Sequence, residues 1–462
     1  MTSDRDLTSG PEWRVLARIA GPMVLGLLAV LSVGLVDTFF VGKLGADPLA
    51  ALSFAFPVTV AVTGLCIGAG VGTASVVSRR IGEGADGEAE TAALDGLLLG
   101  LAVVSSAAAA LAVFTGPLFR LLGAEETAME HILDYMPVYL ASVPFLAASI
   151  ILHNIARSVG EANWPTGIMS VSGGLNIALT AALVFGFGPI PELGILGAAL
   201  GTLLARASVV WVSVWLVARK LDMIHWRVPE WAELRRVWGD IIRVAAPSAA
   251  GNVVNPLSIS LVTAILAGFA QDAVAGFGVA RQVQAIGAIP LLALSSAMGP
   301  IAGQNWGADK RVRISATLWV GFIASTVWSV ALAATLWAFG EPLARLFTDE
   351  DAIAAEAATY LRIVPISLFG FGIAITAAAA FNGLGEPVRG LAFYLVRALG
   401  LLLPLAFAGS LLLGEARGVY IGMALANALA GLGVGVYALH WLRTQTNTCR
   451  EATRTESAPE PA

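Results

Sequence analysis

Residues 25–45 read LGLLAVLSVGLVDTFFVGKLG, an apolar run that contains a single acid, Asp37. At a rise of 1.5 Å per residue, a helix of this length crosses a hydrocarbon core of roughly 30 Å. A carboxylate at the centre of such a helix costs about 2.5–3.5 kcal/mol or more to insert, so it usually faces a polar interior and has a functional role. The stretch therefore predicts a transmembrane helix that carries a candidate ion-binding acid.

The rest of the chain has the same character. Of its 462 residues, 57% are hydrophobic and only 13% are charged, whereas about a quarter of the residues in a soluble domain are charged. The Gly- and Ala-rich runs lack the ten-residue alternation of barrel strands and suit close helix packing. We predict an all-α membrane protein with twelve transmembrane helices, at 15–42, 49–78, 90–114, 130–155, 165–187, 194–218, 240–268, 274–302, 314–339, 353–381, 388–412 and 419–442.

Residues with metal-binding or catalytic chemistry are sparse. The two cysteines, Cys66 and Cys449, cannot form a disulfide framework, and the four histidines are scattered. We therefore expect no metal site and no cofactor. A membrane-embedded enzyme would need clustered histidines, acids, or a nucleophile with its base. The sequence indicates neither an enzyme nor a nucleic-acid partner, and a purely structural scaffold would not need Asp37.

An internal repeat relates the two halves of the chain. The separation of Trp13 from Trp238, 225 residues, aligns the chain with itself without gaps. The matched pairs include Trp13/Trp238, Arg18/Arg243, Pro22/Pro247, Gly26/Gly251, Tyr135/Tyr360, Gly160/Gly385 and Gly197/Gly422. Each half holds six predicted spans, an even number, so both halves start on the same side of the membrane and are parallel repeats. Paired parallel halves are typical of transporters that hold their substrate between them.

The distribution of Lys and Arg predicts the orientation. If both termini are cytoplasmic, the opposite side of the membrane holds only Lys43, Arg120, Arg345 and Arg417. This bias follows the positive-inside rule. We predict an N-terminal six-helix lobe with the cation site at 1–225, a C-terminal six-helix lobe at 226–444, and a disordered cytoplasmic tail at 445–462, whose composition is too polar to fold.

Three motifs resemble one transporter family. VDTFFVGKLGADPLAAL (36–52), HNIARSVGE (153–161) and VARQVQAIGAIPLLALSSAMGPIAGQNWGA (279–308) are similar to the multidrug and toxic compound extrusion (MATE) transporters. The resemblance implies two six-helix lobes in a V and an antiporter that exports small organic compounds in exchange for protons or sodium ions. It also implies a multi-pass protein of the cytoplasmic membrane, and we expect a monomer in the lipid bilayer.

Within that family the chain is most similar to the DinF-like branch, whose cation site lies in the N-terminal lobe. The resemblance places the acid of that site at Asp37, its Asn at Asn176 and a Thr at Thr202. The branch usually has a second acid four residues after the Asn, where this chain has Thr180. The coupling ion and its stoichiometry therefore stay open. The other large branch has an acid in the seventh helix, where this chain has Asn255.

The repeat independently favours a one-sided site. Asp37, Asn176 and Thr180 align with Val262, Leu401 and Leu405, whereas Thr202 aligns with Asn427. Plain structural interpretations stay open for these residues. In these interpretations Asp37 only holds helices together, and Asn176 and Thr180 form hydrogen bonds between helices. Thr202 would form a hydrogen bond with its own backbone, and Pro22 would be an ordinary kink instead of a hinge.

Four arginines interrupt the spans: Arg206, Arg281, Arg362 and Arg397. For the last three we expect snorkelling or pairing with groups at helix ends. Arg206 lies one turn beyond Thr202 and is a candidate modulator of the pKa of Asp37. A deep arginine also mildly favours the alternative function, a flippase of related fold for lipid-linked saccharides, which would have a cationic central cavity.

Overall fold

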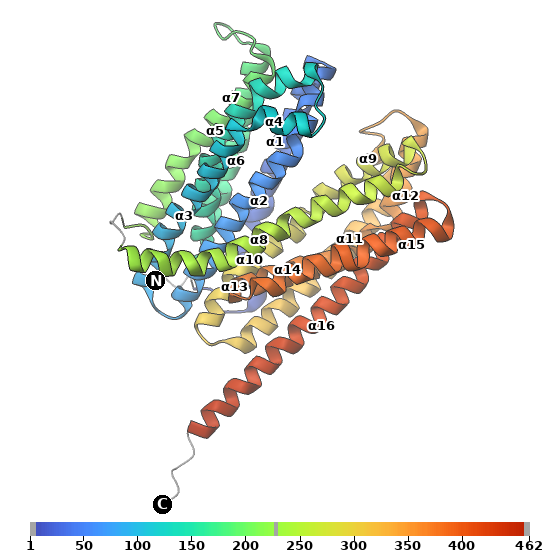
Figure 1. The fold of residues 1–462 in the computed structure, drawn as a ribbon. Coiled ribbons are helices and arrows are strands. Elements are labelled where there is room, and N and C mark those ends of the chain that lie inside the picture. Colours follow the sequence, from blue (N-terminus) through green and yellow to red (C-terminus); the bar gives the residue numbers. More distant parts are fainter. Residues whose placement is uncertain (1–5, 226–229, 457–462) are drawn as a thin grey trace, which may run out of the picture. The chain divides into compact units, whose positions relative to one another are not determined.

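The computed structural model describes residues 6–225 and 230–456, and these residues form helices joined by short turns (Figure 1). Eleven continuous helical spans among the described residues are long and apolar enough to cross a membrane. Two of them, Asp351–Leu384 and Pro387–Leu413, each join two α-helices through a 3-10 or π-helical turn. A twelfth span is a pair of helices, Gln271–Gly287 and Ile289–Gly307, which meet at a bend of 50°. Helices satisfy their own backbone hydrogen bonds, which an apolar bilayer cannot do for them. The predicted all-α fold with twelve spans is confirmed.

In the first half of the chain, the described residues form seven α-helices and the start of an eighth. They are α1 (Glu12–Leu44), α2 (Ala46–Gly82), α3 (Asp86–Val113), α4 (Thr115–Leu121), α5 (Glu126–Ser158), α6 (Asn163–Phe185), α7 (Gly194–Trp215) with the π-helical turn η2 (Leu216–Lys220), and α8 (Trp231–Leu266).

The second half continues with α9 and ends in the long α16. The elements are α9 (Gln271–Gly287), α10 (Ile289–Gly307), α11 (Arg311–Ala344), α12 (Asp351–Ile363), the 3-10 turn η3 (Pro365–Ser367), α13 (Leu368–Leu384), α14 (Pro387–Leu395), the π-helical turn η4 (Val396–Leu402), α15 (Leu403–Leu413) and α16 (Ala416–Glu456).

These helices form two compact units. Unit 1 contains Gly21–Arg80 and Ala85–Val253, and unit 2 contains Asp6–Ala20, Ile81–Gly84 and the chain from Val254 onward. The chain therefore changes unit inside α1, directly before Gly21, and inside α8, after Val253. The predicted lobe boundary at 225/226 adjoins residues 226–229, which lie outside the described residues, and it stays a prediction.

Small residues bring the helices of unit 1 close together. A Cβ on Gly197 of α7 would lie 2.4 Å from the carbonyl oxygen of Leu183 in α6, and one on Gly201 would lie 2.6 Å from the Thr180 hydroxyl. Only glycine allows such an approach, and this spacing is the small-xxx-small pattern of membrane helix pairs. The contact fixes the rotation of α6 and α7 about their axes, which decides the residues of each helix that face the interior.

Unit 2 repeats this local structure. A Cβ on Gly422 of α16, the repeat partner of Gly197, would lie 2.1 Å from the carbonyl oxygen of Leu405. Gly160 and Gly385, another repeat pair, have φ of +81° and +83° where a helix ends. Glycine is favoured there because a side chain strains the left-handed conformation. Equivalent positions in the two halves therefore have equivalent structural roles.

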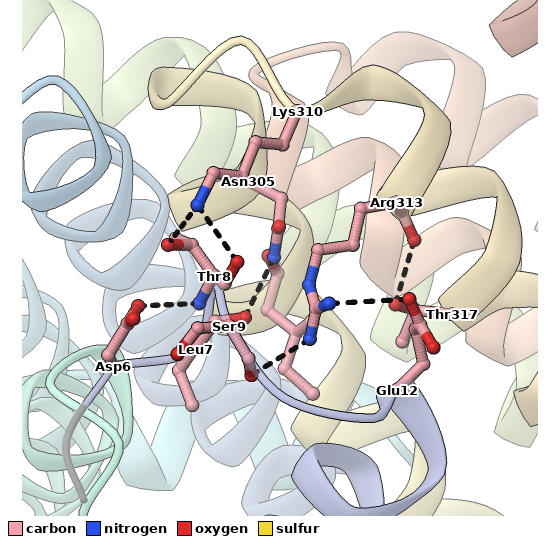
Figure 2. Close-up of polar contacts among 10 residues, drawn as sticks. Asp6, Leu7, Thr8, Ser9, Glu12, Asn305, Lys310, Arg313 and Thr317 are labelled. Carbon is pink, nitrogen blue, oxygen red and sulfur yellow. Dashed lines mark hydrogen bonds and ion pairs between the residues drawn. The ribbon is translucent and has the colours of Figure 1, made fainter. Parts of the chain in front are cut away.

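The segment 6–12, which leads into α1 and includes its first residue, is bound to the α10–α11 turn of unit 2 (Figure 2). Leu7 is fully buried, and its carbonyl accepts a 3.0 Å hydrogen bond from the Asn305 side chain. The Lys310 ammonium donates to the carbonyl and the hydroxyl of Thr8 at 2.9 and 2.8 Å. This network attaches the first described residues of the chain to its second half.

The structure differs from the sequence predictions at three places. The predicted span 274–302 is bent at Ala288, where Pro290 follows within the first turn of α10. The predicted disordered tail is helical as far as Glu456, because α16 continues and Arg311 bonds the Gln445 carbonyl at 2.9 Å; residues 457–462 lie outside the described residues. Arg397 does not snorkel, since its side chain is buried within unit 2.

Candidate functional site

The acid of the opening stretch, Asp37, lies in the second half of α1, within unit 1. Its partners come from two other helices. The Thr180 hydroxyl of α6 and the Arg206 guanidinium of α7 both interact with its carboxylate. Asp37 is half-buried and Thr180 is fully buried. The predicted modulator Arg206, on the helix turn that follows Thr202, is therefore near enough to the acid for their charges to attract.

Asn176 and Thr202 form the second part of the cluster. The Asn176 side-chain amide donates a 3.1 Å hydrogen bond to the Thr202 hydroxyl, which joins α6 to α7. Both residues are buried, at 4% and 5% exposure. Asn176 and Thr180 are four residues apart, so they lie on one face of α6. The four predicted site residues thus gather on three helices, while their functional role stays a prediction.

Arg206 extends this cluster to α5, which the sequence did not indicate. Its guanidinium donates a 2.7 Å hydrogen bond to the Ser142 hydroxyl and lies 5.1 Å from the centre of the Tyr139 ring. Tyr139 stacks on Tyr135, with ring centres 5.7 Å apart. Residues 135, 139 and 142 recur at helical spacing on one face of α5, which is the signal that could have identified them.

Three oxygens in this cluster have unused hydrogen-bonding capacity. Oδ1 of Asp37, Oδ1 of Asn176 and the Thr180 hydroxyl are buried, and within the described ranges none makes a hydrogen bond of good geometry. Buried polar atoms normally have partners, and an exception needs an explanation. Carboxylate, amide and hydroxyl oxygens suit a proton or a hard cation. The arrangement is therefore chemically fit for a small cation.

Tyr139 also lines a cavity of about 210 Å³ in unit 1. The other walls come from Thr59, Thr63 and Gly64 of α2 and from Asn252 of α8. Tyr139 therefore contacts Arg206 and also lines a space with polar and apolar walls. This places the ion cluster and a candidate substrate cavity in contact through one side chain.

Pro22 lies inside α1, fifteen residues before Asp37. It directly follows Gly21, the residue at which α1 enters unit 1. A proline removes one helical hydrogen bond and loosens the preceding turn. The predicted hinge thus lies next to the point where α1 passes between the units. Among the described residues, no group of three or more His, Cys, Asp or Glu could hold a metal ion.

Comparisons with known proteins agree with this organisation. The MatE family model matches residues 22–182 and, a second time, 247–408. The two matches begin 225 residues apart, at Pro22 and Pro247, so they confirm the internal repeat. The chain is 33% identical over 432 residues to the FAD transporter of Shewanella oneidensis, covering 94% of this chain and 95% of that protein.

Two further likenesses extend over the whole fold. The chain is 26% identical over 448 residues to the probable multidrug resistance protein YoeA of Bacillus subtilis, with 94% and 95% of the two chains covered. A crystal structure of a variant of the Vibrio cholerae MATE transporter VcmN matches with a TM-score of 0.89 and 27% identity, covering 94% of this chain and 97% of that one. The chain therefore belongs to the MATE family of membrane transporters and is not an enzyme.

Proposed function

We propose that this transporter is an antiporter that exports organic compounds in exchange for protons or sodium ions, with Asp37 as the exchange site. One observation supports the site most strongly: Asp37, Asn176 and Thr180 present buried oxygens with unused bonding capacity, on two helices of the same unit. A proton on the Asp37 carboxylate, or a sodium ion among the three oxygens, would use this capacity. The assignment to the DinF-like branch rests on the same residues.

The contacts of Arg206 suggest how the ion and the substrate are coupled. When Asp37 is charged, it attracts Arg206, which also holds Ser142 and Tyr139 of α5. Neutralising the acid removes this attraction and frees the guanidinium to move with the Tyr139 ring. Because that ring lines the cavity, ion binding changes the space in which a substrate would lie. An ion can shift the equilibrium between two states only by binding them with different affinity.

Pro22 supplies the bending point in this proposal. A bend of α1 near Gly21 would move the part of the helix that carries Asp37 relative to the part that belongs to unit 2.

The membrane potential supplies enough energy for export against a gradient. One charge crossing 100 mV supplies about 2.3 kcal/mol, enough for roughly fifty-fold accumulation.

The nature of the cargo is supported by the relatives. One is named an FAD transporter and another a probable multidrug resistance protein. FAD and drugs are both organic compounds. We propose the cytoplasmic membrane as the location, with both termini on the cytoplasmic side as the Lys and Arg distribution predicts, and a monomer as the working unit.

The test is gradient-driven uptake into inverted membrane vesicles, with ethidium and FAD as the two probes and with either a pH gradient or a sodium gradient imposed. Asp37→Asn keeps the size of the side chain but removes its titratable charge. We expect this variant to lose gradient-driven uptake while its expression and substrate binding persist. Val262→Ala, at the repeat position equivalent to Asp37, is the matched control and should keep full coupling.

The gradient that drives uptake in the wild type identifies the coupling ion. Full coupling in Asp37→Asn would refute the exchange site. An equal loss in Val262→Ala would refute a one-sided mechanism. If neither probe is moved by either gradient, and the gene instead restores a defect in cell-envelope polysaccharide, the flippase function replaces the antiporter.

A further inference from the structure

Unit 2 contains a buried arginine that the mechanism above does not use. Arg397 is 3% exposed and lies in the π-helical turn η4. Its guanidinium donates hydrogen bonds of 3.0 Å to the Asn427 side chain and 2.6 Å to the Asn255 side chain. Asn427 in turn donates to the Ser367 hydroxyl of η3 at 3.3 Å. Irregular turns of this kind within helices are frequent at functional sites.

A second arginine lies near the first. Arg281 of α9 lies close enough to Arg397 for the two positive charges to repel. It is half-buried and within hydrogen-bonding reach of the Tyr360 hydroxyl, which donates a 2.9 Å hydrogen bond to Gln284. In the part of the chain that the structure describes, no ion pair joins either arginine to an acid. Glu356, an acid on the neighbouring α12, interacts with Tyr420 instead.

Because both arginines lie within membrane spans, burying their charges without an acidic partner costs free energy. Arg281 is ten residues from the start of α9, and Arg397 is ten residues from the start of α14. At 1.5 Å per residue, each lies about 15 Å along its span from that start, which is within the length that crosses a core of roughly 30 Å. Charged groups at this depth normally pair with one another or mark a substrate pathway. Among the described residues, the partners of these two like charges are neutral amides, a phenol and an aromatic ring, so a bound anion would balance their charge.

The chemistry of the groups indicates the anion. Guanidinium groups bind phosphate through pairs of parallel hydrogen bonds, and Nε of Arg397 is buried with no partner among the described residues. Two arginines match a ligand with two negative charges. The Phe371 ring lies 5.0 Å from the Arg397 guanidinium, and Tyr394 also interacts with this arginine; both aromatic residues are half-buried. A pyrophosphate diester with an attached ring system has this combination of charge and apolar surface.

We propose that the cluster of Arg281, Arg397, Asn255 and Asn427 is a substrate subsite that binds the pyrophosphate group of a transported organic anion. Asn255 and Arg281 are half-buried, so the cluster has an accessible side. The proposal rests on the export function proposed above and names the chemical class of its cargo. A pyrophosphate diester occurs both in soluble dinucleotides and in lipid-linked saccharides, and the experiment separates these sources.

The test measures equilibrium binding to the purified full-length protein in detergent, without any gradient. FAD is the probe, and riboflavin has the same ring system without the pyrophosphate. We expect FAD to bind far more tightly than riboflavin and to bind more weakly as salt rises. Arg281→Gln and Arg397→Gln should each weaken FAD binding at least about tenfold, since each removes a charge-assisted contact to phosphate.

Two further variants distinguish loss of the binding site from unfolding as the cause of weaker FAD binding. Arg397→Lys keeps the charge but loses the planar fork, so it should bind FAD with an affinity between those of the wild type and Arg397→Gln. Arg362→Gln is the matched control because Arg362 is exposed and lies 3.9 Å from Glu341, outside the cluster. It should bind FAD like the wild type. Equal binding of riboflavin and FAD, or full FAD binding by Arg281→Gln with an unchanged melting temperature, would overturn the proposal.

The outcome of this binding experiment is independent of the outcome of the antiport test. If the wild type does not bind FAD but still shows Asp37-dependent uptake of ethidium, the anion subsite is wrong and the antiporter stands. If FAD binding depends on both arginines but no gradient drives uptake, the subsite stands and the antiporter is wrong. Displacement of bound FAD by a polyprenyl pyrophosphate, without FAD uptake into vesicles, would assign the subsite to a lipid-linked cargo.

Discussion

Replacing Gly201 by alanine tests the packing that assembles the ion cluster. The new Cβ would lie 2.6 Å from the Thr180 hydroxyl, 2.8 Å from the Thr180 backbone nitrogen and 2.9 Å from its Cα. Ordinary van der Waals contact begins at 3.4 Å. A rotation of the Thr180 side chain relieves only the first of these clashes, because the other two involve backbone atoms. The helices α6 and α7 must therefore separate by several tenths of an ångström.

That separation acts on the neighbouring hydrogen bond. Thr202 directly follows Gly201, and its 3.1 Å bond from Asn176 would lengthen beyond the range of a useful hydrogen bond. Overpacking costs about 1–3 kcal/mol, and the lost hydrogen bond about 0.5–1.5 kcal/mol. Alanine returns about 1 kcal/mol of helix propensity relative to glycine. The net destabilisation is about 0.5–3.5 kcal/mol, by the difference of these contributions.

The assay combines thermal unfolding of the purified protein in detergent with gradient-driven uptake into inverted vesicles. Gly174→Ala is the matched control, because a Cβ at Gly174 on α6 meets nothing within 4 Å. We expect Gly201→Ala to melt below the wild type and to lose coupling, and Gly174→Ala to do neither. If Gly201→Ala melts with or above Gly174→Ala and keeps its coupling, α6 and α7 do not pack as described.

Three further predictions concern the site, the N-terminal segment and the topology. Asn176→Ala and Thr180→Ala should each weaken ion coupling by about 1–2 kcal/mol, less than loss of the acid, as measured by the gradient needed for half-maximal uptake. Burial opposes ionisation of Asp6, but hydrogen bonds within the segment 6–12 and a nearby lysine outweigh it and lower the pKa of this carboxyl below its ordinary 3.8. The ionised form therefore stabilises the fold at neutral pH, and this contribution disappears as the pH falls through the lowered pKa. Asp6→Asn should accordingly melt slightly below the wild type at pH 7 and together with it in strong acid; an equal difference at both pH values would contradict this cause. Reporter fusions after Lys220 should read cytoplasmic and those after Gly45 external, and the reverse result would contradict the orientation.

The repeat and the helices could be predicted from the sequence because each depends on short-range rules. A bilayer requires every spanning backbone to satisfy itself, so about twenty apolar residues already specify a helix. The separation of Pro22 from Pro247 is visible without a structure, and the two family matches begin at these residues. Asp37 could be identified in the same way, because an acid within an apolar run is costly wherever the helix packs.

Only the tertiary structure decided which polar groups meet. Whether Arg206 approaches Asp37 depends on the rotation of α7 about its axis, which the contact of Gly201 with α6 fixes. Arg397 offered the same sequence signal as a snorkelling arginine, yet it is buried between Asn255 and Asn427, 142 and 30 residues away along the chain. Helix formation is local, whereas the pairing of buried polar side chains depends on how distant helices rotate and pack, and no spacing within one span contains that information.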